Sequence, residues 1–438
     1  TMLRAYGQAF SADDDVSLII KTFDNPHNEV HRWLEQARGS RVDFPDVIIL
    51  MEDLCEAQLK ALYEQCHVLL APSRAEGFGL PMAEAMLSNL AVITTGWGGQ
   101  TDFCNDQTAW LIDYSFGRAQ THFGLFTTAW AEPDEQHLSA LCKEVYATPQ
   151  ARRQKKIHEG QRLLRQRFTW KQVAQRMLRA AKACATATPV PEPRIGWVST
   201  WNTHCGIASY SEALLRQFTS TVTVLAAEVA DGLTKEEMAV RRCWLQGEDD
   251  PLFDLLDQIE QEQLDVIVIQ FNYSFFNFDA LAKCLNQLTQ ANRVVIMTLH
   301  TTTDPDTPPD KKLEQLAPAL CRCARVLVHS HADLNRLKQM GVIDNVTLFP
   351  HGFFDNPLPL EKPKKQTDEF VLASYGFFLP QEGLLELIEA LALLRSQGHN
   401  CRLIMANAQY PIESSADLVA RARQRIEALG LEKHITIC

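Results

Sequence analysis

Residues 75–84 read Ala-Glu-Gly-Phe-Gly-Leu-Pro-Met-Ala-Glu. The apolar run before them, His67 to Ala71, predicts a buried strand, and Ala83 to Leu90 predicts a helix with Pro81 near its first turn. A strand that passes through a glycine loop into a helix start is typical of an anion site. The free N–H groups and the positive end of the helix dipole favour a phosphate or diphosphate there.

Two carboxylates frame this loop. Gly77 and Gly79 allow the backbone to come close to a ligand, but a phosphate is not stabilised by carboxylates. Glu76 and Glu84 are better suited to accept hydrogen bonds from neutral hydroxyls, such as those of a ribose or a hexose. The loop therefore predicts a nucleotide-sugar ligand. In the alternative interpretation, Glu84 only complements the helix dipole and Glu76 lies in a solvated loop.

The surrounding sequence favours the first interpretation. Val68 to Thr95, with the loop Gly96-Trp97-Gly98-Gly99-Gln100-Thr101-Asp102, closely resembles the donor-binding motif of retaining glycosyltransferases of the two-Rossmann (GT-B) architecture, family four. In that family the first glutamate lies near the sugar and the second binds the ribose. The resemblance assigns these roles to Glu76 and Glu84. It also turns the backbone of Gly77, Phe78, Gly79 and Leu80 toward the sugar and diphosphate.

Composition is compatible with this family. The chain has 438 residues, 46% of them hydrophobic, which is enough for two or three domains. A net charge of −12 argues against a nucleic-acid binder. No apolar run is long enough to span a bilayer and no signal peptide opens the chain, so we expect a soluble, cytoplasmic protein.

We expect neither a cofactor nor a metal. The resemblance implies metal independence, and no Asp-x-Asp pair lies near these loops; Asp304-Pro305-Asp306 is predicted to be a turn. The 12 cysteines are scattered, which predicts buried, reduced thiols. Cys321 and Cys323 lie near two histidines, but they are two positions apart on a predicted helix. They would therefore point to nearly opposite sides and could not share a metal.

Strands alternate with helices along the chain, which predicts Rossmann-like α/β domains with parallel sheets. We expect four segments: a donor domain lacking its start (1–185), a proline-rich linker (186–193), an acceptor-side domain (194–360) and the beginning of a second donor domain (366–438). The predicted strands are Val16–Lys21, Asp46–Met51, Val68–Ala71, Ala91–Thr94, Arg194–Ser199, Val222–Ala226, Val266–Phe271, Val294–Leu299, Val326–His329, Phe370–Tyr375, Cys401–Ala406 and His434–Ile437. The predicted helices are Glu29–Arg38, Glu56–Gln65, Ala83–Leu90, Glu135–Tyr146, Ala151–Ala185, Ser209–Phe218 and Leu384–Ser396.

The predicted acceptor-side domain contains two further candidate sites. The loop before the helix at Ser209 includes Gly206 and Ile207, and it resembles the family's glycine loop that meets the donor phosphates and the acceptor. His300 follows a predicted strand, at the sheet edge where open α/β folds bind ligands. In the family a histidine here faces the donor sugar, so we expect it to position the donor. Alternatively, His300 bonds only a backbone carbonyl, and His351 is expected to be an interdomain turn residue.

Self-similarity suggests a tandem protein. Val16 to Lys21 resembles Cys401 to Ala406, and Asp46 to Met51 resembles His434 to Ile437, at an offset of roughly 385 to 388 residues. A second glutamate pair would fall about 26 residues beyond Cys438. We therefore expect a window from a longer tandem enzyme in which neither active site is complete, and in which Glu76 and Glu84 share no cleft with His300.

The second copy departs from the family pattern. Where the family presents an arginine and a lysine to the diphosphate, in the loop Gly376 to Gly383, this chain has Phe377 and Glu382. A carboxylate beside a diphosphate is repulsive, so the second copy is expected to be weak, altered in donor choice or inactive.

The resemblance implies a retaining hexosyltransferase. The donor would be a nucleotide-diphosphate sugar, with mannose favoured by analogy, and the acceptor a glycan or lipid-linked glycan in surface-polysaccharide or lipopolysaccharide synthesis. It also implies peripheral association with the inner face of the membrane. Two alternatives stay open: a non-catalytic scaffold or binding module, and a nucleotide-sugar epimerase or hydrolase of the same architecture.

Overall fold

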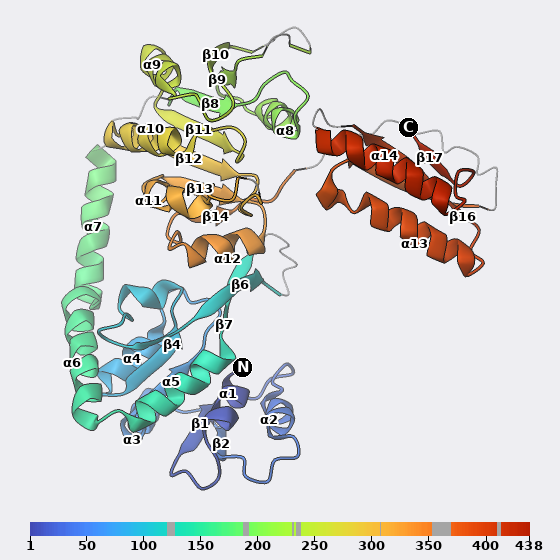
Figure 1. The fold of residues 1–438 in the computed structure, drawn as a ribbon. Helices are drawn as coiled ribbons and strands as arrows, with labels where there is room; N and C mark the ends of the chain where they lie inside the picture. Colours follow the sequence, from blue (N-terminus) through green and yellow to red (C-terminus); the bar gives the residue numbers. More distant parts are fainter. Residues whose placement is uncertain are drawn as a thin grey trace. The chain divides into compact units, whose positions relative to one another are not determined.

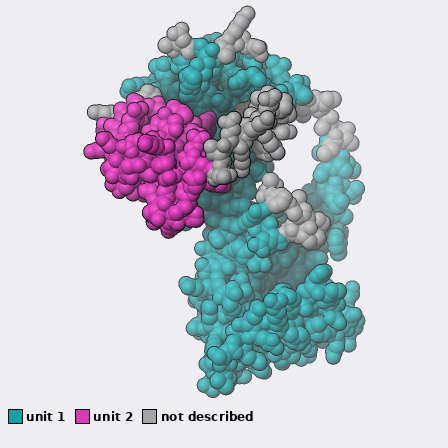
Figure 2. Space-filling view, turned by 90° about the vertical axis from the view of Figure 1, so that its right-hand side faces the viewer, with its two compact units in different colours: residues 1–352 teal, residues 353–438 magenta. Residues whose placement is uncertain are grey.

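The computed structural model describes residues 1–120, 128–186, 192–229, 232–233, 238–306, 308–352, 369–409 and 413–438. They form two compact units, residues 1–352 and 353–438 (Figure 2). Most of the predicted linker (187–191) and the end of the predicted acceptor-side domain (353–360) lie outside the described residues.

The first part of unit 1 is a series of short parallel sheets covered by helices (Figure 1). Strands β3, β4 and β5 form one parallel sheet, β1 and β2 another, and β6 and β7 an antiparallel hairpin. All five residues of β4 are buried, as expected for a parallel strand covered on both faces. In chain order the elements are α1 (Met2–Ala9), β1 (Ser17–Lys21), α2 (Val30–Arg38), β2 (Asp46–Leu50), α3 (Glu56–Gln65), β3 (Val68–Ala71), α4 (Leu80–Leu87), β4 (Ala91–Thr95), η1 (Gly99–Asp102), β5 (Trp110–Ile112), β6 (Tyr114–Arg118), β7 (Ala129–Pro133), α5 (Glu135–Ala147), α6 (Gln150–Arg167) and α7 (Trp170–Thr186).

Two helix predictions in this part are corrected. The helix predicted at Ala83 begins earlier, at Leu80, because Gly79 in a left-handed conformation caps it. The helix predicted over Ala151 to Ala185 is two helices, α6 and α7. The Phe168 ring lies 5.5 Å from that of Phe78, and Thr169 N–H and Oγ1–H donate to Gln172 Oε1 at 3.2 and 2.9 Å, which caps the second helix.

The second part of unit 1 is a seven-stranded, wholly parallel sheet with strand order β10-β9-β8-β11-β12-β13-β14 (Figure 1). Its central strands are mostly apolar, and β11 has five of six residues buried. The elements are β8 (Ile195–Ser199), α8 (Gly206–Leu215), β9 (Val222–Ala227), β10 (Val240–Trp244), α9 (Phe253–Gln261), β11 (Val266–Phe271), α10 (Phe278–Gln290), β12 (Val294–Leu299), η2 (Leu313–Leu316), α11 (Ala317–Leu320), β13 (Arg325–Val328), α12 (His331–Gln339) and β14 (Val346–Leu348). The predicted helix at Ser209 begins earlier, at Gly206.

The hairpin β6–β7 joins the two parts of unit 1. The Asn335 side chain of α12 hydrogen-bonds the backbone of Phe116 twice: Phe116 N–H donates to Oδ1 at 2.7 Å, and Nδ2 donates to Phe116 O at 3.0 Å. Lys338 forms an ion pair with Asp113 at 2.5 Å. Phe116 also packs against the core of the seven-stranded sheet. The hairpin therefore contacts the second part of unit 1 through both apolar and polar side chains.

Unit 2 is a three-stranded parallel sheet with two helices. Leu384, Ile388 and Leu391, at helical spacing on α13, are buried in a core with Leu403 and Met405 of β16. Gly376, predicted to open a loop, instead lies within β15 opposite Asn407, because the strand continues to Phe377. The elements are β15 (Phe370–Phe377), η3 (Pro380–Glu382), α13 (Leu384–Ser396), β16 (Cys401–Ala408), α14 (Glu413–Ala428) and β17 (Ile435–Ile437).

The prediction of an α/β fold with Rossmann-like parallel sheets is confirmed. Cys321 and Cys323, predicted on a helix, instead follow α11 in a turn, and within the described ranges no cluster of His, Cys, Asp or Glu could hold a metal. Asp304 lies in a loop, as predicted, and accepts hydrogen bonds from Tyr273 Oη and Leu313 N. None of the helices in the described part of the chain is long and apolar enough to cross a membrane.

Candidate functional site

Two loops meet at the carboxyl edge of the sheet β3-β4-β5. The first follows β3 and contains Glu76 to Gly79; the second follows β4 and contains Gly96 to Gly99. Gly99 N–H donates to Glu76 O at 2.8 Å. A Cβ atom on Gly99 would lie 2.0 Å from Gly77 O, so only glycine fits at this crossing of the two backbones. The loops therefore form one rigid pair.

Gly79 is the second fixed glycine. Its φ of +87° is in the left-handed region, and a Cβ atom there would lie 2.8 Å from Gln100 Cβ. Gly77 differs from it, because a Cβ on Gly77 would meet nothing within 4 Å. Space above Gly77 is therefore open to a ligand, while Gly79 and Gly99 are required by the protein itself.

Gln100 holds the second loop from beneath. Its side chain is fully buried, and Nε2 donates to Thr95 O at 2.9 Å and Trp97 O at 2.8 Å. Its Oε1 is buried and has no hydrogen-bond partner among the described residues. Sequence reasoning assigned no role to Gln100, and the only signal was a polar residue within a glycine-rich loop.

The predicted anion groups are available at the start of α4. Within the described residues, the amides of Phe78, Gly79 and Leu80 have no hydrogen-bond partner. The side chain of Phe78 turns inward, with its ring 5.0 Å from Phe103 and 5.5 Å from Phe168. Phe78 can thus contribute only its backbone to a ligand, and its ring anchors the loop to the core.

The two glutamates lie on either side of these amides in the chain. Glu76 is half-buried, and its Oε1 accepts a hydrogen bond from Ser73 Oγ at 2.8 Å. Glu84 is exposed on α4, and its carboxylate has no hydrogen-bond or ion-pair partner in the part of the chain that is described. Burial raises the pKa of Tyr63, and the nearby Glu84 carboxylate raises it further. Glu84 is thus free to accept ligand hydroxyls, whereas Glu76 shares one oxygen with Ser73.

Arg74 is a residue of this region that the sequence analysis missed. Its guanidinium pairs with Glu132 at 2.9 Å and lies 4.6 Å from the centre of the Trp130 ring. Its carbonyl accepts a hydrogen bond from Ala131 N at 3.0 Å. Arg74 therefore anchors the first loop to β7, and no feature of the sequence around it indicates that contact.

His300 lies at a second cluster, at the carboxyl edge of the seven-stranded sheet. Its Nε2 hydrogen-bonds Gln270 Oε1 at 2.8 Å, and its ring centre lies 4.8 Å from Tyr210 and 5.2 Å from His329. His351 also packs against Tyr210, at 4.9 Å. The bond to a backbone carbonyl considered above for the His300 ring is not found; its partner is the Gln270 side chain.

His300 is uncharged at neutral pH. Burial, together with the neighbouring His329 and His351, lowers its pKa to about 4. Since Gln270 Nε2 donates to Thr298 Oγ1 at 3.4 Å, Gln270 Oε1 faces His300 and accepts from Nε2–H. Nδ1 is then the basic nitrogen of the His300 ring.

We expect NMR titration of the His300 imidazole to give a pKa of about 4. The His300→Gln variant identifies the signal. Because this pKa falls on folding, the unfolded chain binds the proton first, so stability falls as the pH drops from about 6.5 to about 4. A titration midpoint near 6.5 would show that the imidazole is solvated.

Gly206 and Ile207 begin α8, beside this cluster. Cys205 caps the helix in an extended conformation, and Ile207 packs against the core of the sheet. A Cβ on Gly206 would meet nothing within 4 Å, so the space above its backbone is open. The structure thus brings Gly206, Ile207 and His300 to the same edge of one sheet.

The two clusters are not directly linked within the described ranges. Among the described residues, no hydrogen bond, ion pair or ring contact joins Glu76 or Glu84 with His300. The connection between the two parts of unit 1 runs through the hairpin: the Trp97 ring lies 5.5 Å from Phe116, which Asn335 holds. The expectation that they share no cleft stays a prediction.

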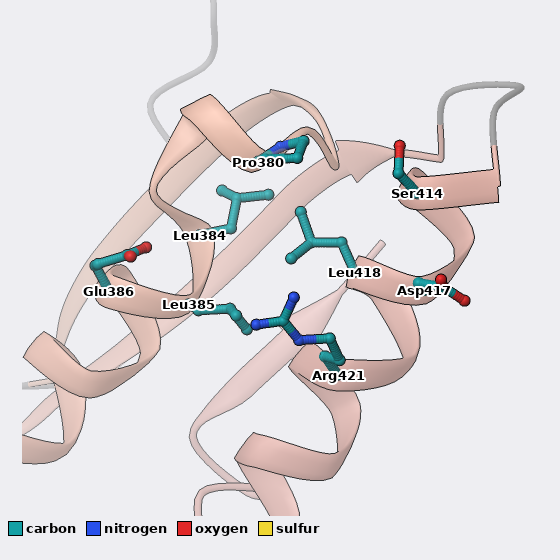
Figure 3. A pocket seen from close by; sticks show the side chains of 8 residues that line it. All are labelled: Pro380, Leu384, Leu385, Glu386, Ser414, Asp417, Leu418 and Arg421. Atoms are coloured by element: carbon teal, nitrogen blue, oxygen red, sulfur yellow. The ribbon is translucent and has the colours of Figure 1, made fainter. Parts of the chain in front are cut away.

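In unit 2, the loop that departs from the family pattern borders a cavity of about 280 Å³ (Figure 3). Glu382 is exposed in η3, and Phe377 ends β15. Arg421 of α14 points into the cavity between Leu385 and Leu418, and Glu386 and Asp417 lie at its margin. A cation is therefore present near this loop, but it comes from α14 and is offset by two carboxylates.

The loop pair of β3 and β4 lies within a recognisable segment. Residues 2–117 match the family model described as glycosyl transferases group 1. The match covers about a quarter of the chain and contains Glu76, Gly99 and Glu84. It supports the group 1 resemblance of this segment; the assignment to family four and the tandem organisation stay predictions.

Comparison with curated proteins gives no match. Solved structures similar to this chain include HepE from Anabaena in complex with UDP, with 20% identity over 56% of this chain and 68% of that chain and a TM-score of 0.45. Sucrose-phosphate synthase from Thermosynechococcus elongatus has 15% identity over 56% and 70%, with a TM-score of 0.44. A UDP-forming α,α-trehalose-phosphate synthase from Burkholderia xenovorans has 14% identity over 56% and 73%, with a TM-score of 0.42. At these identities the ligand of a relative is no evidence for the ligand of this chain.

Proposed function

We propose that residues 1–185 hold the donor half of a nucleotide-sugar glycosyltransferase. The observation that carries this proposal is the rigid loop pair: Gly99 locks against Gly77, and the free amides of Phe78 to Leu80 open at the start of α4. The match of residues 2–117 to the group 1 family supports it independently.

The chemistry would be transfer of a hexose with retention of configuration. The bond between the anomeric carbon and the diphosphate would break as an acceptor hydroxyl oxygen bonds that carbon, and the proton of that hydroxyl would pass to an oxygen of the leaving diphosphate. The free amides and the α4 dipole would stabilise the charge of the leaving diphosphate, and Glu84 would fix the ribose. Glu76 would accept a hydrogen bond from a sugar hydroxyl through Oε2, since Ser73 Oγ already donates to Oε1.

The family, donor sugar, acceptor and tandem organisation are proposed from the sequence resemblance. We propose family four, a tandem of two units, a hexose such as mannose, and a glycan or lipid-linked glycan acceptor in polysaccharide synthesis at the cytoplasmic side of a membrane. His300 would position a donor in the second unit: its neutral imidazole at neutral pH can accept a sugar hydroxyl on Nδ1. No metal or cofactor is needed in this scheme.

The proposed transfer is tested with a panel of radiolabelled nucleotide sugars and glycan acceptors. We expect label in the glycan only when the acceptor is present. Release of free sugar, or conversion of the nucleotide sugar at the same rate without acceptor, would instead indicate a hydrolase or epimerase. Binding without any turnover, in the full protein and with every acceptor, would favour the scaffold.

A further inference from the structure

Helix α7 has one apolar and one basic side. Successive residues of a helix turn by about 100°, which places Trp170, Val173, Ala174, Met177, Leu178 and Ala181 on one side. The other side carries the four charged residues of α7, Lys171, Arg176, Arg179 and Lys182, all of them basic. A helix with this pattern lies in the interface of a membrane when nothing covers its apolar side.

The apolar side is open within unit 1. Trp170 is 85% exposed, Met177 68% and Leu178 61%. For comparison, on α6 Ile157 and Leu164 are buried against the neighbouring sheet and helix. Of these two consecutive helices, only α7 therefore has an exposed apolar side, which begins where Phe168 and Thr169 separate it from α6.

Charge around α7 favours an anionic partner. Residues 150–186 contain eleven Lys and Arg against one acidic residue, Glu159, in a chain whose net charge is −12. Each basic residue near an anionic bilayer contributes about 1 kcal/mol to its attraction. Pairing with α7 of a second copy would bring two basic segments together, and a nucleic acid would leave the apolar side uncovered.

A hollow suited to a lipid head group lies beside the start of α7. Arg167, Arg176 and Arg179 border it, with Asp102 as the one carboxylate, and its volume is about 560 Å³. Arg176 is held in place, since Nη2 donates to Arg167 O at 2.7 Å and its guanidinium lies 5.5 Å from the Phe168 ring centre. One guanidinium group can donate two hydrogen bonds to a phosphate group. The positive charge of the three arginines exceeds the negative charge of Asp102.

We propose that α7 binds an anionic lipid bilayer, with Trp170, Met177 and Leu178 inserted among the acyl chains and the arginines at the head groups. This surface meets the segment of the candidate donor loops only at Asp102, and its binding to a membrane does not depend on the proposed transfer. It would hold the protein where a lipid-linked acceptor lies.

Vesicle sedimentation of the full chain tests this proposal. We expect binding to vesicles of phosphatidylcholine with phosphatidylglycerol, weakened by added salt, and none to phosphatidylcholine alone. The double variant Trp170→Ser/Met177→Ser should bind vesicles at least about tenfold more weakly. In the double variant Arg176→Gln/Arg179→Gln, the binding that remains should depend much less on salt. The Trp170 emission should shift to the blue, a change lost in Trp170→Phe.

A matched control distinguishes binding through α7 from non-specific binding through any exposed aromatic side chain. Phe23→Ser with Trp33→Ser removes two aromatic side chains that are 61% and 51% exposed elsewhere, and should bind vesicles like the wild type. The proposal is overturned by no binding to anionic vesicles, or by equal binding of the α7 variants. It is also overturned if those variants instead break a self-association seen in sedimentation velocity, or if an oligonucleotide binds and vesicles do not.

Discussion

Glu84→Ala is expected to weaken nucleotide-sugar binding by roughly a hundredfold, about 3 kcal/mol, with the fold unchanged. The reason is that a carboxylate with no protein partner accepts charge-assisted hydrogen bonds only from the ligand. Removing it costs nothing in the free protein, because Glu84 is exposed on α4 and supports no other side chain by hydrogen bond within the described residues.

Titration calorimetry with a uridine and a guanosine diphosphate sugar measures this loss. Glu35→Ala is the matched control, since Glu35 is likewise an exposed helical glutamate, on α2, and should leave affinity unchanged. Glu84→Gln should give an intermediate loss, because the amide oxygen still accepts but carries no charge. Unaltered affinity of Glu84→Ala would end the ribose assignment.

Gly99→Ala is expected to have the second large effect. Its new Cβ atom would lie 2.0 Å from Gly77 O and 2.4 Å from Gly77 C, both backbone atoms, so the two loops must separate. Forcing an extra methyl group into such a contact costs about 1–3 kcal/mol. We expect lower thermal stability of unit 1 and loss of nucleotide-sugar binding, because the amides of Phe78 to Leu80 lose their support.

Gly77→Ala is the partner experiment to Gly99→Ala. A Cβ there meets no protein atom within 4 Å, so the melting temperature should stay unchanged. Binding should still fall if a diphosphate approaches this backbone, because the methyl group occupies the ligand's space. Full binding by Gly77→Ala would place the ligand elsewhere, and a stable, binding-competent Gly99→Ala would show that the loops do not act as a pair.

The sequence predicts the regular elements well where a strand is uninterrupted and apolar. β3, β11 and β12 have the predicted limits, because each is a short apolar run that pairs with parallel neighbours; in β11, five of the six residues are buried. The break between α6 and α7 was missed because the helical spacing continues through it. The break coincides with the tertiary contact of the Phe168 ring with Phe78 and with the cap that Thr169 and Gln172 form at the start of α7.

The residues of the candidate site also fall into those that the sequence predicts and those that it does not. Glu76, Glu84 and the glycines could be found from the sequence, because their spacing carries the chemistry of the loop. Gln100 and Arg74 could not, since their role lies in contacts with Thr95, Trp97 and Glu132 that only the folded loops create. The contact of Asn335 with Phe116 joins residues 219 positions apart and leaves no local signal.

The central claim is that the loops after β3 and β4 hold the nucleotide sugar. Amide hydrogen exchange with and without a saturating nucleotide sugar tests it most directly, because it locates the ligand on the backbone. The account predicts new protection of peptides covering 76–84 and 96–102, with no change at 203–207. Protection confined to 203–207 and His300, or none at either loop, would contradict it.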